Sequence, residues 1–136
     1  MTNIVIYTHS DCLQKNNGQN HPEKKERLEI ILNSIKSIKE LDIKIESSPL
    51  AEMNHIYLIH PKNYIQNIFS LIPEEGLISA EKEPYADTFL CPNSKNAILR
   101  ACGSGIAASN DMFSKNISKF FCAIRPPGHH AETKRI

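Results

Sequence analysis

Short apolar runs alternate along this chain with longer segments whose apolar residues recur at helical spacing. Residues 4–7 (Ile-Val-Ile-Tyr) predict a first strand, and the polar stretch 8–20 predicts a long loop after it. Residues 43–46 alternate with period two, which is typical of a half-buried strand. Residues 120–124 are continuously apolar and predict a parallel strand covered on both faces.

Three segments between these runs predict helices, and each begins at or just after a proline: Pro22, Pro61 and Pro92. Glu23 in the first segment suits the positive end of a helix dipole. Pro73 ends the second, because proline has no amide hydrogen for the helix ladder. The apolar positions are Leu28, Ile31, Leu32, Ile35 and Ile38, then Tyr64, Ile65, Ile68, Phe69 and Ile72, then Ala97, Ile98, Ala101, Gly105, Ala108 and Met112.

The order of these segments predicts the class of fold. Strands that alternate with helices favour an α/β fold with a mainly parallel sheet, and the helical stripes are interpreted as core packing. In the third helix, Gly103 and Gly105 would let a neighbouring element approach closely. The 136 residues show no internal repeat or domain boundary, so we expect a single domain.

Composition and charge restrict the classes of partner and the location that we expect for this protein. Apolar residues make up 40% of the chain and charged residues 23%, the balance of a soluble globular protein. A net charge of +1 gives no long-range field for nucleic acid or an anionic membrane, so we expect neither as a partner. The start of the chain lacks the features of a signal peptide and no window has the length of a membrane span, so we expect a cytoplasmic location.

The four cysteines lie far apart in the sequence. Cys12, Cys91, Cys102 and Cys122 form no C-x-x-C pair, so neither a zinc knuckle nor a redox motif is indicated. We expect reduced thiols, with Cys102 and Cys122 buried.

The most informative segment is 125–130, Arg-Pro-Pro-Gly-His-His, which directly follows the apolar run. Ligands of open α/β sheets bind at the carboxyl ends of strands, so this loop lies where chemistry is expected. Its prolines and glycine can hold His129 and His130 in a set orientation, and imidazoles exchange protons near neutral pH. Taken alone, however, a pair of histidines is explained equally well by a surface loop or an adventitious metal contact.

The neighbouring residues favour the functional interpretation. Arg-Pro-Pro-Gly-His-His-Ala at 125–131 resembles the signature of the histone deacetylase superfamily, which also includes acetylpolyamine amidohydrolases and acetoin-utilisation proteins. His-Pro-Glu at 21–23, followed by Arg27 and Leu28, is similar to the family's early segment, and residues 60–65 resemble its His-x-x-x-Tyr-Ile stretch.

The similarity continues between these motifs. Asp87-Thr88, followed by Cys91-Pro92 and a helix bearing alanine and glycine, resembles the family segment that lines the rim of the substrate channel. Lys15 and Lys25 stand where family members often carry His and Pro. These differences affect the expected packing of the local loops but not the catalytic pair. The resemblance covers nearly the whole chain and implies a three-layer fold of the arginase/deacetylase type.

The resemblance also implies a mechanism. In the family, a zinc-bound water attacks the carbonyl of an acetyl-amide, and a tyrosine hydroxyl helps to stabilise the oxyanion. By motif position His129 would take the proton of the water and His130 would serve in transfer to the leaving amine. Asp87 and Pro127 fall at substrate-binding positions, although a turn or capping role suits Asp87 equally well. The implied substrate is acetylated lysine, an acetylated polyamine or another small acylated amine.

The zinc ligands of the family, an Asp-x-His pair and a later Asp, lie downstream of the His-His motif, as does the tyrosine. The upstream residues His9, Asp11, His21, His55 and His60 lack metal-ligand spacing. We therefore assign no metal ligand and expect no zinc on this chain itself. Residues 1–136 are expected to be the N-terminal portion of one histone-deacetylase-like domain, with its sheet incomplete at the C-terminal end, and to be inactive alone.

Two other hypotheses stay open. In the first, the chain is a non-catalytic interaction module or one half of a split protein. It would pair with a C-terminal fragment or with itself through an unfinished sheet edge. A weaker hypothesis makes His129, His130 and a cysteine a new metal site, although no spacing supports it.

Overall fold

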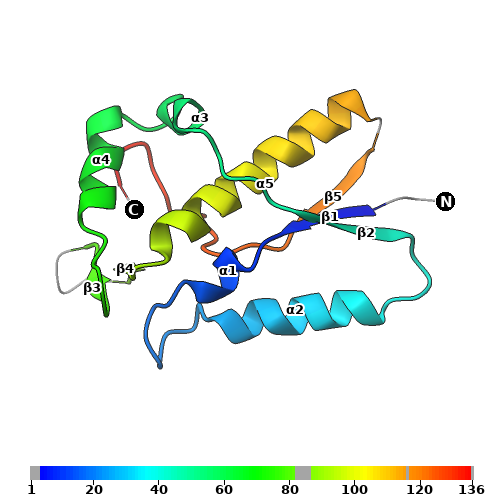
Figure 1. Cartoon of the computed structure of the whole chain (residues 1–136), viewed down its shortest axis with the longest axis horizontal. Helices are drawn as coiled ribbons and strands as arrows, with labels where there is room; N and C mark the ends of the chain where they lie inside the picture. Colours follow the sequence, from blue (N-terminus) through cyan, green and yellow to red (C-terminus); the bar gives the residue numbers. More distant parts are fainter. Residues whose placement is uncertain (1–3, 82–86, 116, 136) are drawn as a thin grey trace.

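The computed structural model describes residues 4–81, 87–115 and 117–135, and its centre is a parallel three-stranded sheet (Figure 1). The strand order is β2 (Ile43–Ser47), β1 (Ile4–Thr8), β5 (Lys119–Cys122). Ile4 of β1 lies opposite Ile43 on one side and opposite Lys119 on the other. Parallel neighbours need long crossover connections, and helices provide them here.

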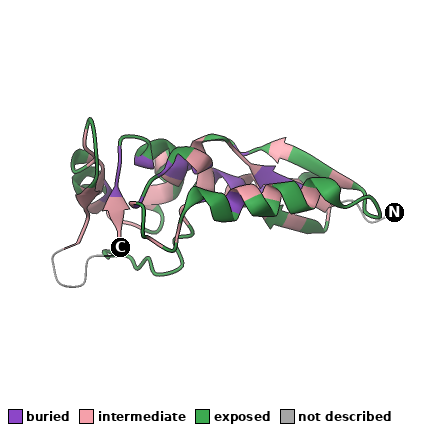
Figure 2. Cartoon of the chain, turned by 90° about the horizontal axis from the view of Figure 1, so that it is seen from below, coloured by how far each residue is buried: buried purple, intermediate pink, exposed green. Residues whose placement is uncertain are grey.

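Helices cover both faces of this sheet (Figures 1 and 2). On one face Ile6 and Ala123 pack with Cys12 of α1 (Asp11–Gln14) and Leu28 of α2 (Lys25–Ser37). On the opposite face Val5 and Tyr7 pack with Ala108 of α5 (Ser94–Ser114). Successive strand residues point to opposite faces, so β1 contributes to both halves of the core. The predicted three-layer α/β fold with a mainly parallel sheet is confirmed.

The remaining elements lie between β2 and α5 in the sequence. They are α3 (Met53–Tyr57), α4 (Lys62–Ser70) and the short antiparallel pair β3 (Ile78–Ser79) and β4 (Phe89–Leu90). The prolines at 61 and 73 flank α4 as predicted. The sequence did not predict α3, which buries none of its residues and so shows no apolar stripe. The predicted loop over 8–20 is also partly wrong, because it contains α1, a helix of four residues that is too short to show periodicity. No helix in the described ranges is long and apolar enough to cross a membrane.

Close packing of α5 depends on one of its two predicted glycines. A Cβ atom added at Gly103 would lie 1.9 Å from the Pro49 carbonyl oxygen. Next to this contact, the Ala51 amide donates a 2.9 Å hydrogen bond to the Leu99 carbonyl. Gly105 faces open space, so the prediction of a close approach is correct for Gly103 and wrong for Gly105.

The burial of several other residues also differs from the predictions. The run 120–124 is not covered on both faces, because Phe121 is 47% exposed. In addition, β5 lies at an edge of the sheet, with a single strand neighbour among the described residues. Cys102 is exposed and Cys122 only half-buried, whereas Cys12 and Cys91 are buried; all four are free thiols. The first helix begins at Lys25 rather than at Pro22, and Ile31 and Ile38 lie at its exposed margin.

Candidate functional site

The two adjacent histidines lie on a tight turn beyond the carboxyl end of β5. The Ala131 amide donates a 3.0 Å hydrogen bond to the Gly128 carbonyl, so His129 and His130 occupy the central positions of a four-residue turn. Gly128 has a φ of 69°, a left-handed conformation that favours glycine. The two imidazole centroids are 4.2 Å apart and both residues are exposed. Both rings are therefore open to a ligand.

Arg125 anchors this loop in the protein interior. It is 3% exposed, and its Nε and Nη2 atoms donate to the two carboxylate oxygens of Glu23 at 2.5 and 3.0 Å. Nη1 donates at 3.0 Å to the carbonyls of both Cys12 and Lys15, and Nη2 also reaches the Glu23 carbonyl at 3.5 Å. These five hydrogen bonds match the five N–H donors of a guanidinium group. The loop is thus tied to both α1 and the start of α2.

Glu23 also connects Arg125 to Asp87, a candidate substrate-binding residue. Its backbone amide donates at 3.0 Å to Nδ1 of His21. Nε2 of His21 therefore carries the proton and donates to the Asp87 carbonyl at 3.0 Å and to its Oδ1 at 3.1 Å. The Asp87 side chain is 80% exposed, so it is held from one side and open to solvent on the other.

Asn17 and Lys15 extend the same network towards β4. The Asn17 amide donates to the Glu23 carboxylate at 2.7 Å and to its carbonyl at 2.9 Å. The Lys15 ammonium donates to Asn17 Oδ1 and, at 3.1 Å, to the Phe89 carbonyl. Burial lowers the pKa of Lys15, and the nearby Glu23 charge opposes that effect.

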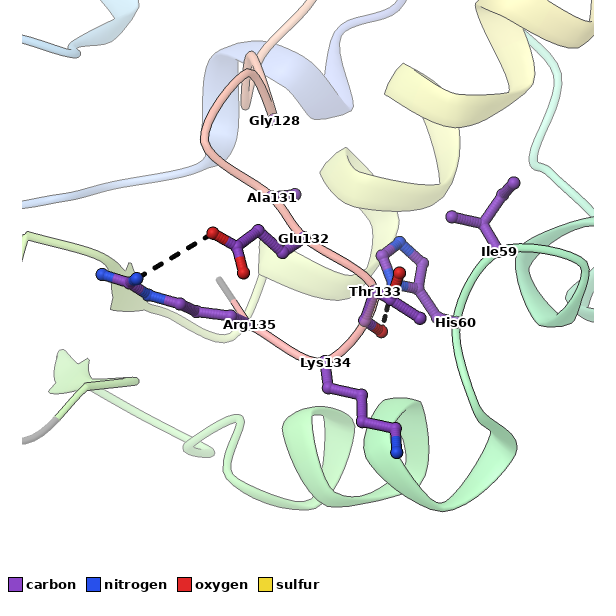
Figure 3. Close-up of a pocket in the computed structure, with 8 residues that line it drawn as sticks. All are labelled: Ile59, His60, Gly128, Ala131, Glu132, Thr133, Lys134 and Arg135. Carbon is purple, nitrogen blue, oxygen red and sulfur yellow. Dashed lines mark hydrogen bonds and ion pairs between the residues drawn. The ribbon is translucent and has the colours of Figure 1, made fainter.

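Two hollows flank the network. The larger, about 900 Å³, is lined by Gly128, Ile59, His60 and the segment 131–135, and in it His60 Nδ1 donates at 3.0 Å to the Thr133 carbonyl (Figure 3). The smaller, about 470 Å³, lies beside His21, Asp87 and Phe89. Pro127 is exposed and lines neither hollow. His129 and His130 also line neither hollow, whereas Asp87 lines the smaller one. Asp87 and the histidine pair thus lie in separate surroundings that are connected through Glu23.

Sequence reasoning missed the importance of three residues. Glu23 lies just before α2 rather than in its first turn, and its carboxylate binds Arg125, a partner that the helix-dipole interpretation did not include. His21 belongs to the His-Pro-Glu segment, but its contact with Asp87 joins residues 66 positions apart. Arg125 lies inside the recognised motif, and only its burial reveals its role.

Comparison with known proteins decides the family. The model of the histone deacetylase domain matches residues 21–136 of this chain. The chain belongs to the histone deacetylase family.

Individual members of this family agree with the match. The chain is 29% identical to the type-2 histone deacetylase 2 of Dictyostelium discoideum, over 94% of this chain and 9% of that protein. It is 26% identical to a probable deacetylase of Archaeoglobus fulgidus, over 97% of this chain and 35% of that protein. The chain thus spans about a tenth to a third of these relatives.

A solved structure shows the same fold. The crystal structure of the HDA15 HD domain superposes with a TM-score of 0.80 at 18% identity, over 100% of this chain and 39% of that one. The chain therefore covers less than half of this solved structure, as it does of the two relatives above.

Proposed function

We propose that this chain carries the proton-transfer pair of an amide hydrolase that removes acetyl groups from amines. The observation that carries the proposal is the turn at Gly128, which follows the carboxyl end of β5 and presents the His129 and His130 rings 4.2 Å apart. Membership of the histone deacetylase family supports this reaction class. The proposed substrates are acetylated lysine, acetylated polyamines or other small acylated amines.

The two histidines divide the proton transfers. A neutral imidazole has one N–H group and one nitrogen without a hydrogen. His129 accepts the proton of the attacking water on the nitrogen that carries no hydrogen. His130 donates a proton to the amine as the bond between the acyl carbon and nitrogen breaks. Their exposure leaves both rings accessible to substrate and water.

Asp87 and Pro127 are the proposed substrate contacts. The Asp87 carboxylate is fixed by His21 through Oδ1 and is otherwise exposed, so it can accept a hydrogen bond from the substrate's N–H group. Pro127 is exposed beside the histidine turn and offers an apolar surface to the substrate chain.

We propose that zinc, which the histone deacetylase family uses, is not held by the described part of this chain. Residues 4–81, 87–115 and 117–135 contain no group of three His, Cys, Asp or Glu side chains that could hold a metal ion. A catalytic zinc site uses three protein ligands. We therefore propose that the isolated chain holds no catalytic zinc and does not hydrolyse acetyl-amides by itself.

The test combines this chain with the remainder of a family domain. The isolated chain is assayed with zinc and an acetyl-lysine peptide, alone and after mixing with the separately expressed C-terminal part of the Archaeoglobus fulgidus relative. We expect turnover only in the mixture, and its loss with His129→Ala and with His130→Ala. The matched control is His55→Ala, an exposed histidine of α3. Turnover by the isolated chain with one bound zinc would refute its inactivity, and a mixture that is indifferent to both motif histidines would refute their roles.

A second candidate function is an interaction module that pairs with a C-terminal fragment. It is favoured by β5, which has one strand neighbour among the described residues, and by the half-exposed Phe121 on it. Sedimentation velocity of the same mixture tests it, since absence of a complex would contradict pairing even if the histidine roles were correct.

A further inference from the structure

We infer that Glu23 is a positioning residue that sets the His129–His130 turn relative to Asp87. The inference rests on the proposed function, because it concerns how the two parts of that site are held.

The first link runs from Glu23 to the histidine turn. The Glu23 carboxylate takes two hydrogen bonds from Arg125, whose side chain is 4% exposed. Between Arg125 and Gly128 stand only two prolines, whose rings fix φ near −65°. The connection is therefore stiff, and a displacement of the guanidinium is transmitted to the turn.

The second link runs from Glu23 to Asp87. The Glu23 amide fixes the ring of His21 through Nδ1, and His21 Nε2 contacts both the carbonyl and the carboxylate of Asp87. The side-chain and backbone groups of Glu23 thus serve different halves of the site. Asn17 holds Glu23 from a third direction, at both its carboxylate and its carbonyl.

The energetics explain why Glu23 is suited to this role. A buried guanidinium that loses its carboxylate is an uncompensated charge, so the loop must rearrange when the partner is removed. Cys12 and Lys15 bind Nη1 only through neutral carbonyl groups. Among these contacts, Glu23 alone supplies the compensating charge.

The test uses Glu23→Gln in the full chain, with Asp111→Asn as the matched control. Both changes convert a carboxylate to an amide, and the two side chains are 13% and 14% exposed. Asp111 pairs with Tyr7 and Lys115 and contacts neither histidine of the turn. The probe is the set of ring carbon and proton NMR signals of His21, His129 and His130, assigned through single His→Gln variants.

We expect Glu23→Gln to shift the signals of His129 and His130 in a chain whose circular dichroism is unchanged, with a smaller shift for His21, because the Glu23 backbone amide that binds His21 is retained. Asp111→Asn should leave all three in place. Unmoved signals in folded Glu23→Gln, or equal shifts in both variants, would overturn the inference. If Glu23→Gln fails to fold, Arg125→Lys is measured in the same way, because it keeps the charge but removes the two-point contact. Since this measurement needs no turnover, its failure is distinguishable from failure of the deacetylase assay.

Discussion

The hydroxyl of Tyr7 in β1 donates a 2.6 Å hydrogen bond to Asp111 in α5, and so joins the central strand to the helix that covers it. Lys115 donates to the same carboxylate oxygen at 3.0 Å. Burial raises the pKa of Tyr7 above its ordinary value of 10.0, and the hydrogen bond to Asp111 and the negative charge of that residue raise it further. The phenol is therefore held in its neutral form by the fold.

This pair predicts an alkaline loss of stability. Because the folded pKa of Tyr7 is raised, its contribution to the free energy of unfolding is complete below about pH 10 and is lost as the pH rises beyond that value towards the folded pKa. Urea denaturation at intervals from about pH 8 to about pH 11 measures this loss. Tyr7→Phe should lose less stability over this range than the wild type, whereas Tyr57→Phe in α3 should behave as the wild type. An equal loss in Tyr7→Phe would contradict the assignment.

The two glycines of α5 predict opposite effects of the same substitution. Gly103→Ala would place a methyl group 1.9 Å from the Pro49 carbonyl oxygen, so the helix must shift, and a loss of about 1–3 kcal/mol in the free energy of unfolding is expected. Gly105→Ala meets nothing within 4 Å and should gain up to about 1 kcal/mol, because alanine favours a helix interior. Urea denaturation of both variants provides the comparison. A gain of stability in both would show that Pro49 yields without cost.

The two glycines illustrate a general point: the sequence predicted local elements better than it predicted the packing of individual residues. Local periodicity correctly predicted the first two strands, the three longest helices and the α/β class, because spacing depends only on neighbouring residues. The exposure of Phe121, by contrast, depends on which elements pack against β5. The apolar run 120–124 does not specify those elements. Cys102 precedes the tightly packed Gly103 in α5 but is itself exposed, and helical spacing had not distinguished their environments.

The candidate site shows the same limit on a larger scale. The motif around His129 and His130 was recognisable because its residues are contiguous. Arg125 and Glu23 meet across 102 positions of sequence, and no local pattern predicts such a pairing. The His-Pro-Glu segment did signal that residues 21–23 matter, but their partners became apparent only in the folded chain.

Gly128 predicts a backbone effect confined to the histidine turn. Its φ of 69° is unfavourable for residues with a Cβ, so Gly128→Ala should cost about 1–2 kcal/mol in the free energy of unfolding. Gly76→Ala is the matched control, since Gly76 has a φ of 72° and likewise has nothing within 4 Å of an added Cβ. Both variants should lose similar stability by urea denaturation. Only Gly128→Ala should move the NMR signals of His129 and His130; movement in both variants would indicate a general loosening of the chain.

The exposed edge of the sheet predicts where a partner strand would pair. Phe121 is 47% exposed on β5, whereas Phe113 is 88% exposed near the end of α5. Lysine on an edge strand opposes pairing with another strand, so Phe121→Lys should weaken a complex with the C-terminal fragment by roughly tenfold, or about 1.4 kcal/mol. Phe113→Lys introduces the same charge at a more exposed phenylalanine and should leave the affinity unchanged. Sedimentation velocity at several concentrations measures both, with circular dichroism to verify folding. If Phe113→Lys weakened the complex and Phe121→Lys did not, the contact would lie at the end of α5 and not on β5, which is an edge strand among the described residues.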